Sequence, residues 1–128
     1  MKVIQELIAY FDRRGKLSPD DKERLLRQGF LASEAPGNMA RFCDQVGQTY
    51  YFRVDGKDSG PIWGTDIYTA DSALPAAAVH AGAVGWGETK VIKVTVVEPL
   101  QHYQGSSRNG INSHDFGPYK TAYRVDPV

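Results

Sequence analysis

The sequence predicts an α+β fold in which a central buried helix is surrounded by strands and preceded by a helical hairpin. The first observation is the segment 71–85, D-S-A-L-P-A-A-A-V-H-A-G-A-V-G, in which apolar or small residues occupy every face. A helix that is apolar all round lies in a membrane or in a core, and this one is far shorter than the roughly 20 residues of a membrane span. The second observation is the series of β-branched and aromatic runs after residue 47.

Composition limits the size of the protein and its partners. The chain has 128 residues, of which 41% are hydrophobic, enough for one modest core. Lys and Arg total 15, as do Asp and Glu, so no net field attracts nucleic acid or an anionic membrane. The single cysteine, Cys43, excludes an intrachain disulfide, and residues 1–10 lack the pattern of a signal peptide. These features predict a cytoplasmic protein with no nucleic-acid partner and no membrane span.

The N-terminal part has the periodicity of two helices. Ser18, Pro19 and Gly29 mark the start and end of the second helix. The first helix has an apolar face made by Val3, Ile4, Leu7, Ile8 and Phe11. We expect residues 1–35 to form a helical hairpin and residues 46–128 to form the main domain. Because such a face is not stable in water, residues 1–31 are predicted to bind the main domain, a second copy or a partner protein.

The main domain is expected to contain several strands around the buried helix. The helix is predicted to be capped by Asp71 or Ser72, with Pro75 in its first turn and glycines from Gly82 onward ending it. Runs of β-branched and aromatic residues predict strands at 48–54, 62–68, 90–97 and 121–125, with a short one at 100–104.

Several motifs resemble the LCCL domain. They are Tyr68-Thr-Ala-Asp71-Ser72, Ala76-Ala-Ala-Val-His80-Ala-Gly82, Val94-Thr-Val, Tyr103-Gln-Gly-Ser106-Ser-Arg-Asn109-Gly-Ile-Asn-Ser113 and Tyr123-Arg-Val125. The resemblance covers about Ile62 to Val125 and implies a central helix wrapped by antiparallel sheets. It also implies a role in ligand binding, with lipopolysaccharide or other glycans as the suggested ligands.

The cysteine content departs from that resemblance. Secreted animal members resemble one another in having four cysteines in two disulfides, and Pro75 stands where one of these cysteines usually falls. The chain has none of the four, which fits a bacterial-type member from a reducing compartment.

No residue pattern predicts an enzyme, a cofactor or a metal site. Ser72 and His80 are eight residues apart, about 12 Å along a helix, too far for a catalytic pair. We therefore expect Ser72, His80 and Gly82 to be structural, with His80 buried, neutral and hydrogen-bonded. His102 and His114 lie in turn-rich segments without metal-ligand spacing. Cys43 is expected to be a small buried hydrophobic residue.

Residues 105–110 form the most ligand-like segment, because hydroxyl, amide and guanidinium groups suit a sugar or a phosphate. The predicted ligand-binding residues are Tyr68, Tyr103, Ser106, Arg108, Asn109, Asn112 and Ser113. The alternative is a tight turn at Asn109-Gly110 with serines bonded to nearby backbone. Trp86, between two glycines, fits either a sugar-stacking platform or a lid over the core, and the lid is preferred; Trp63 is assigned to the core. We thus predict a non-enzymatic binding module or, alternatively, a protein-interaction module acting through the hairpin.

Overall fold

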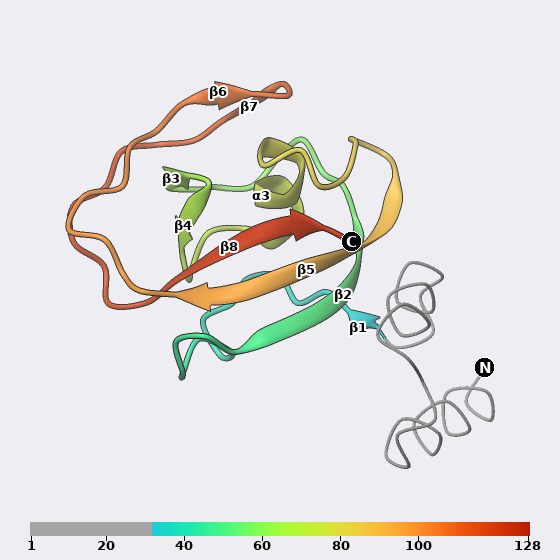
Figure 1. The fold of residues 1–128 in the computed structure, drawn as a ribbon. Coiled ribbons are helices and arrows are strands. Elements are labelled where there is room, and N and C mark those ends of the chain that lie inside the picture. Colours follow the sequence, from blue (N-terminus) through green and yellow to red (C-terminus); the bar gives the residue numbers. More distant parts are fainter. Residues whose placement is uncertain (1–31) are drawn as a thin grey trace, which may run out of the picture.

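The computed structural model describes residues 32–128, which fold around one six-stranded sheet and one short helix (Figure 1). The predicted helical hairpin falls almost entirely on residues 1–31, which lie outside the described residues. The elements in chain order are β1 (Ser33–Glu34), β2 (Thr49–Asp55), β3 (Gly64–Thr65), β4 (Ile67–Thr69), α3 (Leu74–His80), β5 (Thr89–Val97), β6 (Ser107–Arg108), β7 (Ile111–Asn112) and β8 (Ala122–Pro127).

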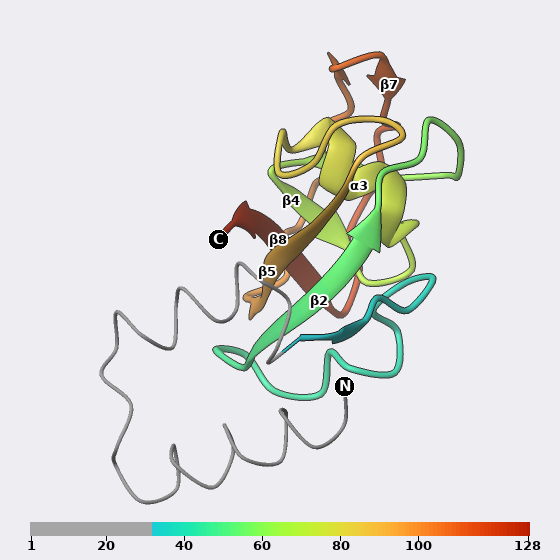
Figure 2. The ribbon, with the colours of Figure 1, turned by 90° about the vertical axis from the view of Figure 1, so that its right-hand side faces the viewer.

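The sheet has the strand order β1-β2-β5-β8-β4-β3. All its pairs are antiparallel except β1 with β2. β5 lies at the centre, where Ile92 is paired with Phe52 and Val94 with Val125. The predicted strands at 48–54, 90–97 and 121–125 correspond to β2, β5 and β8. Their buried β-branched and aromatic residues form the core with α3, which lies against one face of the sheet (Figure 2).

Two predicted strands differ from the structure. Residues 62–68 do not form one strand, because the chain reverses at Asp66, whose φ of 67° is left-handed, to make the β3–β4 hairpin. Gly64 makes this hairpin feasible, since a Cβ there would lie 2.2 Å from the carbonyl oxygen of Ile67. Residues 100–104 form no strand; Tyr103 makes only an isolated bridge to Phe116.

The helix α3 begins without the predicted side-chain cap. Its N-cap is Ala73, and Pro75 lies in the first turn as predicted. The amide of Ala73 donates to the carbonyl of Pro61, and that of Leu74 to the carbonyl of Gly37, each at 2.9 Å. Backbone carbonyls of other segments thus replace the cap predicted at Asp71 or Ser72. The helix ends at His80, before Gly82, which has a φ of 82°.

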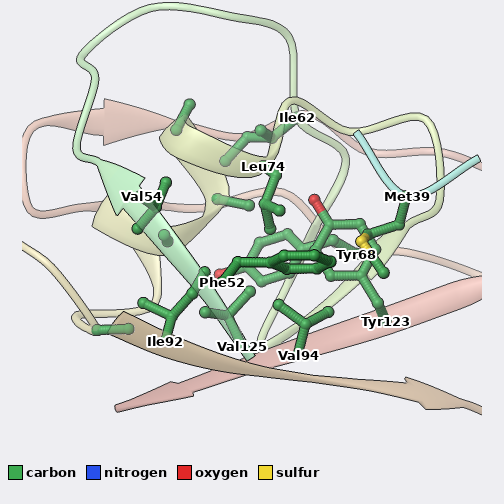
Figure 3. Packing of buried hydrophobic residues seen from close by; sticks show 14 of the residues in the cluster. Met39, Phe52, Val54, Ile62, Tyr68, Leu74, Ile92, Val94, Tyr123 and Val125 are labelled. Carbon is green, nitrogen blue, oxygen red and sulfur yellow. The ribbon is translucent and has the colours of Figure 1, made fainter. Parts of the chain in front are cut away.

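The core lies between α3 and the sheet. The alanines at 76–78 are fully buried, and their small volume lets large side chains approach the helix. Figure 3 shows Phe52, Ile92 and Val94 of the sheet filling the space below Leu74.

The same core includes residues before the predicted domain start. Met39 and Cys43 are buried among the sheet residues, and Met39 donates its amide to the carbonyl of Ala70 at 2.9 Å. The strand β1, which lies within the predicted hairpin region 1–35, pairs with β2 of the main sheet. The packed unit therefore extends to residues before 46.

No helix in the described residues is long and apolar enough to cross a membrane.

Candidate functional site

His80 lies at the C-terminal end of α3 and is completely buried. Its Nδ1 lies 2.8 Å from the hydroxyl of Tyr68, and its Nε2 lies 3.1 Å from the carbonyl oxygen of Ser106. A carbonyl can only accept, so Nε2 carries the proton and Nδ1 accepts from Tyr68. Both ring nitrogens are therefore occupied within the protein, and the ring links β4, α3 and the 103–113 segment.

The surroundings keep this pair uncharged. Burial lowers the pKa of His80, and the Ser106 carbonyl opposes this only in part. Burial also raises the pKa of Tyr68 to about 12, so its hydroxyl keeps the proton that it donates. A neutral, enclosed imidazole has both nitrogens bonded within the protein, which supports a structural role.

Ser72 forms a separate polar cluster below the start of α3. Its hydroxyl accepts from the amide of Trp63 at 2.9 Å and lies 2.9 Å from the hydroxyl of Thr69. Its carbonyl accepts from the hydroxyl of Tyr123 at 2.9 Å. Ser72 therefore joins β4, β8 and the 61–63 segment, and its hydroxyl contacts no histidine. This arrangement provides no catalytic pair.

Asn109 attaches the β6–β7 hairpin to the end of α3. Its amide nitrogen donates to the carbonyls of Val79 and His80, at 3.0 and 3.1 Å. Asn109 has a φ of 53° and Gly110 a φ of 80°, which is the tight turn considered as the alternative for this segment. Asn109 therefore satisfies helix carbonyls that lack partners within α3.

The other polar residues of the loop are also bonded internally. The amide of Ser106 donates to the hydroxyl of Ser113 at 2.7 Å, and that hydroxyl donates back to the carbonyl of Ser106. The hydroxyl of Ser106 lies 2.6 Å from that of Thr65. Ser107 donates to the side-chain oxygen of Asn112. Most of the predicted ligand-binding groups thus have partners that hold the loop in shape.

The two tyrosines predicted to contact a ligand are fully buried. Tyr68 binds His80, as described above. The hydroxyl of Tyr103 accepts from the amide of Leu100 at 3.0 Å and lies 3.4 Å from the carbonyl of Tyr119. Neither ring reaches the surface, so both tyrosines lie outside the candidate site.

An open pocket of about 480 Å³ lies beside Arg108. Arg108 forms an ion pair with Asp66 at 2.6 Å, and both side chains are largely exposed, at 45% and 67%. His102 and Gln104 are also exposed on the pocket wall, and neither side chain makes a hydrogen bond within residues 32–128. The remaining lining residues are Thr65, Ile67, Leu100, Gly105 and Ser106.

Trp86 is the residue whose environment differs most from expectation. It is 71% exposed and lines a second pocket of about 380 Å³, so the interpretation as a lid over the core is wrong. Its two glycine neighbours have no side chains that could cover the ring.

Trp63 is half-buried rather than a core residue and packs edge-on against Phe116. Among residues 32–128, no three His, Cys, Asp or Glu side chains converge to hold a metal ion.

The sequence matches the LCCL domain family over residues 35–123. The chain belongs to this family. The match begins 27 residues before the 62–125 span of the motif resemblance and includes the segment that contributes Met39 and Cys43 to the core.

Two curated proteins are similar over part of the chain. The human protein called cysteine-rich secretory protein LCCL domain-containing 2 is 37% identical over 70 residues, which cover 53% of this chain and 14% of that protein. The Schizosaccharomyces pombe transcriptional regulatory protein rxt3 is 34% identical over 59 residues, covering 43% of this chain and 17% of that protein. The match therefore spans less than a fifth of each relative.

Proposed function

We propose that the chain is a non-enzymatic binding module whose pocket beside Arg108 takes a polar ligand, with a glycan or lipopolysaccharide as the ligand class. The observation that carries this proposal is the Arg108 pocket itself. It combines a guanidinium, an imidazole and an amide on an exposed surface, and the carboxylate of Asp66 is ion-paired with that guanidinium beside the pocket. A hydroxyl-rich ligand requires both donors and acceptors, and this set provides both.

The Arg108–Asp66 ion pair is well suited to exchange partners. An exposed ion pair contributes only about 0–1 kcal/mol to stability, so a ligand can separate the two side chains at little cost. Arg108 is then free to bind a sugar hydroxyl or a phosphate, and Asp66 can accept from a hydroxyl. The internal bonds of Ser106, Ser113 and Asn109 hold the loop in place before the ligand arrives, which reduces the entropy lost on binding.

Isothermal titration with glycans and lipopolysaccharide tests this proposal. Arg108→Ala should weaken binding by about tenfold or more. Arg124→Ala is the matched control, because Arg124 is also exposed and ion-paired, with Asp126 on the same strand. Equal affinities for the two variants, or no binding of any ligand by the wild-type chain, would contradict the proposal.

We propose a second function in protein assembly for residues 1–31, which lie outside the described residues. The apolar face of the first predicted helix supports it, because such a face needs a covering partner. Sedimentation of the full chain tests this: self-association, or a stable complex through this segment, is expected. A cytoplasmic location belongs to the same proposal and is supported by the single cysteine, Cys43.

A further inference from the structure

The exposed indole of Trp86 is held by a firmly bonded loop. The amide of Gly87 donates to the carbonyl of Gly56 at 3.0 Å, and the amide of Gly56 donates to the carbonyl of Glu88 at 2.9 Å. The amide of Gly85 donates to the carboxylate of Glu88, also at 2.9 Å. These bonds fix the backbone on both sides of the indole. The exposure of Trp86 is therefore a property of the folded loop.

The close contact at Gly56 adds to this rigidity. A Cβ at Gly56 would lie 2.1 Å from the carbonyl oxygen of Gly85, so the loop sits directly on the turn after β2. Burying a tryptophan is among the most stabilising contributions that a side chain can make. A rigid loop that keeps the ring in water gives up that contribution, as expected for a surface that binds something else.

The polar groups beside the indole include both donors and acceptors. Lys90 and Glu88 are about half exposed, with Nζ 3.4 Å from Oε1. The Asn109 amide nitrogen is held by the carbonyls of α3, so its oxygen is left as an acceptor. The pocket thus has one flat aromatic surface, an ammonium donor, and carboxylate and amide acceptors.

We infer that this pocket binds one pyranose ring of a neutral glycan, with an apolar face of the sugar stacked on Trp86. The ring hydroxyls then bond to Lys90, Glu88 and Asn109. A volume of about 380 Å³ is near the lower end for ligand sites, which suits a single ring. The Glu88 carboxylate and the Lys90 ammonium balance each other's charge, so the pocket does not select a charged ligand, and a single aromatic ring lacks the cage that recognises quaternary ammonium groups.

This inference rests on the proposed glycan-binding function and adds a second subsite to it. Arg108 and Asn109 are adjacent in the β6–β7 hairpin, and each lines one of the two pockets. The hairpin therefore separates a charged subsite from a stacking subsite. The charged subsite alone would serve a ligand recognised by its phosphate or carboxylate, whereas the stacking subsite selects for a neutral ring.

The test uses the full chain and a panel of neutral methyl glycosides of common hexoses and N-acetylhexosamines. The chain has two tryptophans, so an amide-correlation NMR spectrum shows two indole signals, which Trp86→Phe assigns. Binding should shift the Trp86 signal and leave that of Trp63 in place. Trp86→Ala should weaken affinity by about tenfold or more, and Trp86→Phe by less.

Phe116→Ala is the matched control, because Phe116 is another exposed aromatic residue, at 43%, and lies outside this pocket. Its affinity should stay within about twofold of wild type. If no neutral glycoside shifts the Trp86 signal while a ligand still depends on Arg108, this inference is overturned and the proposed function stands. If neither Trp86→Ala nor Arg108→Ala weakens binding, both this inference and the proposed function are overturned. A Trp86 signal that responds only to peptides or vesicles also overturns it.

Discussion

Replacing His80 by alanine should destabilise the domain strongly. The substitution leaves the buried hydroxyl of Tyr68 without a partner, which costs about 1–3 kcal/mol. It also removes the bond to Ser106 and most of a fully buried ring, whose loss of packing adds about 2 kcal/mol. The sum is about 3–5 kcal/mol. For a domain of this size, each kcal/mol lowers Tm by about 4–8 °C, so a drop of roughly 12–40 °C is expected.

Urea denaturation followed by circular dichroism measures this change. Tyr68→Phe in the same background completes a double-mutant cycle, because the double variant leaves neither hydroxyl nor imidazole unpaired. The cycle should give a coupling energy of about 1–2 kcal/mol. His102→Ala is the control, since His102 is exposed and its loss should cost less than about 0.5 kcal/mol. A His80→Ala variant as stable as His102→Ala, or a coupling near zero, would refute the structural role.

The pH dependence gives an independent check on His80. Burial lowers its folded pKa below the value of about 6.5 in the unfolded chain, so the unfolded state binds the proton more readily. Its contribution is therefore complete above about pH 6.5 and is lost as the pH falls from there toward the folded pKa. The slope attributable to this group is at most about 1.4 kcal/mol per pH unit. The difference between wild type and His80→Ala should shrink over that window, and a constant difference would contradict it.

Three further predictions concern Asn109 in the β6–β7 hairpin, the cysteine Cys43 and the N-terminal limit of the domain. Asn109→Ala should lower stability by about 1–2 kcal/mol through the lost helix-cap bonds and positive φ, whereas Asn109→Gly should recover part of it in the same denaturation assay. Melting curves with and without reductant should coincide, because burial raises the pKa of Cys43 to about 11 and it has no intrachain partner; a large shift would reveal an intermolecular disulfide. Removal of residues 1–31 should leave a cooperatively folding domain, while removal of 1–45 should not, since it deletes Met39 from the core; circular dichroism melts distinguish them.

The sequence predicts the central strands and the buried helix because their patterns are local. β5 is β-branched at every position except Lys90 and Lys93, and the segment of α3 is apolar on all sides, so each specifies its own structure. The cap of α3 could not be predicted, since carbonyls of Gly37 and Pro61 reach its amides only after the chain has folded. The reversal at Asp66 was likewise hidden, because a left-handed aspartate between strand-forming residues has no distinctive pattern.

The candidate site is predictable only in part for a related reason. A loop rich in serine, asparagine and arginine looks the same in sequence whether its groups face a ligand or bond to one another. The structure shows that Asn109, Ser106 and Ser113 bond internally, while Arg108 is on the surface. The exposure of Trp86 had a local indication in its flanking glycines, but two opposite interpretations of that pattern were available.

The bonds that hold the loop in shape and the side chains exposed in the two pockets come largely from different residues, which has a consequence for ligand specificity. His80, Asn109 and Ser106 belong to the two motifs that carry the family resemblance, and their bonds connect the helix, β4 and the hairpin. These bonds fix where the two pockets lie; His80 is buried behind them, while Ser106 and Asn109 each also contribute to one pocket wall. The exposed groups at Trp86 and His102 lie outside those motifs. A fold that keeps its framework bonds can therefore change ligand by substituting such exposed residues alone, because they contribute little to the core that holds the pockets in place.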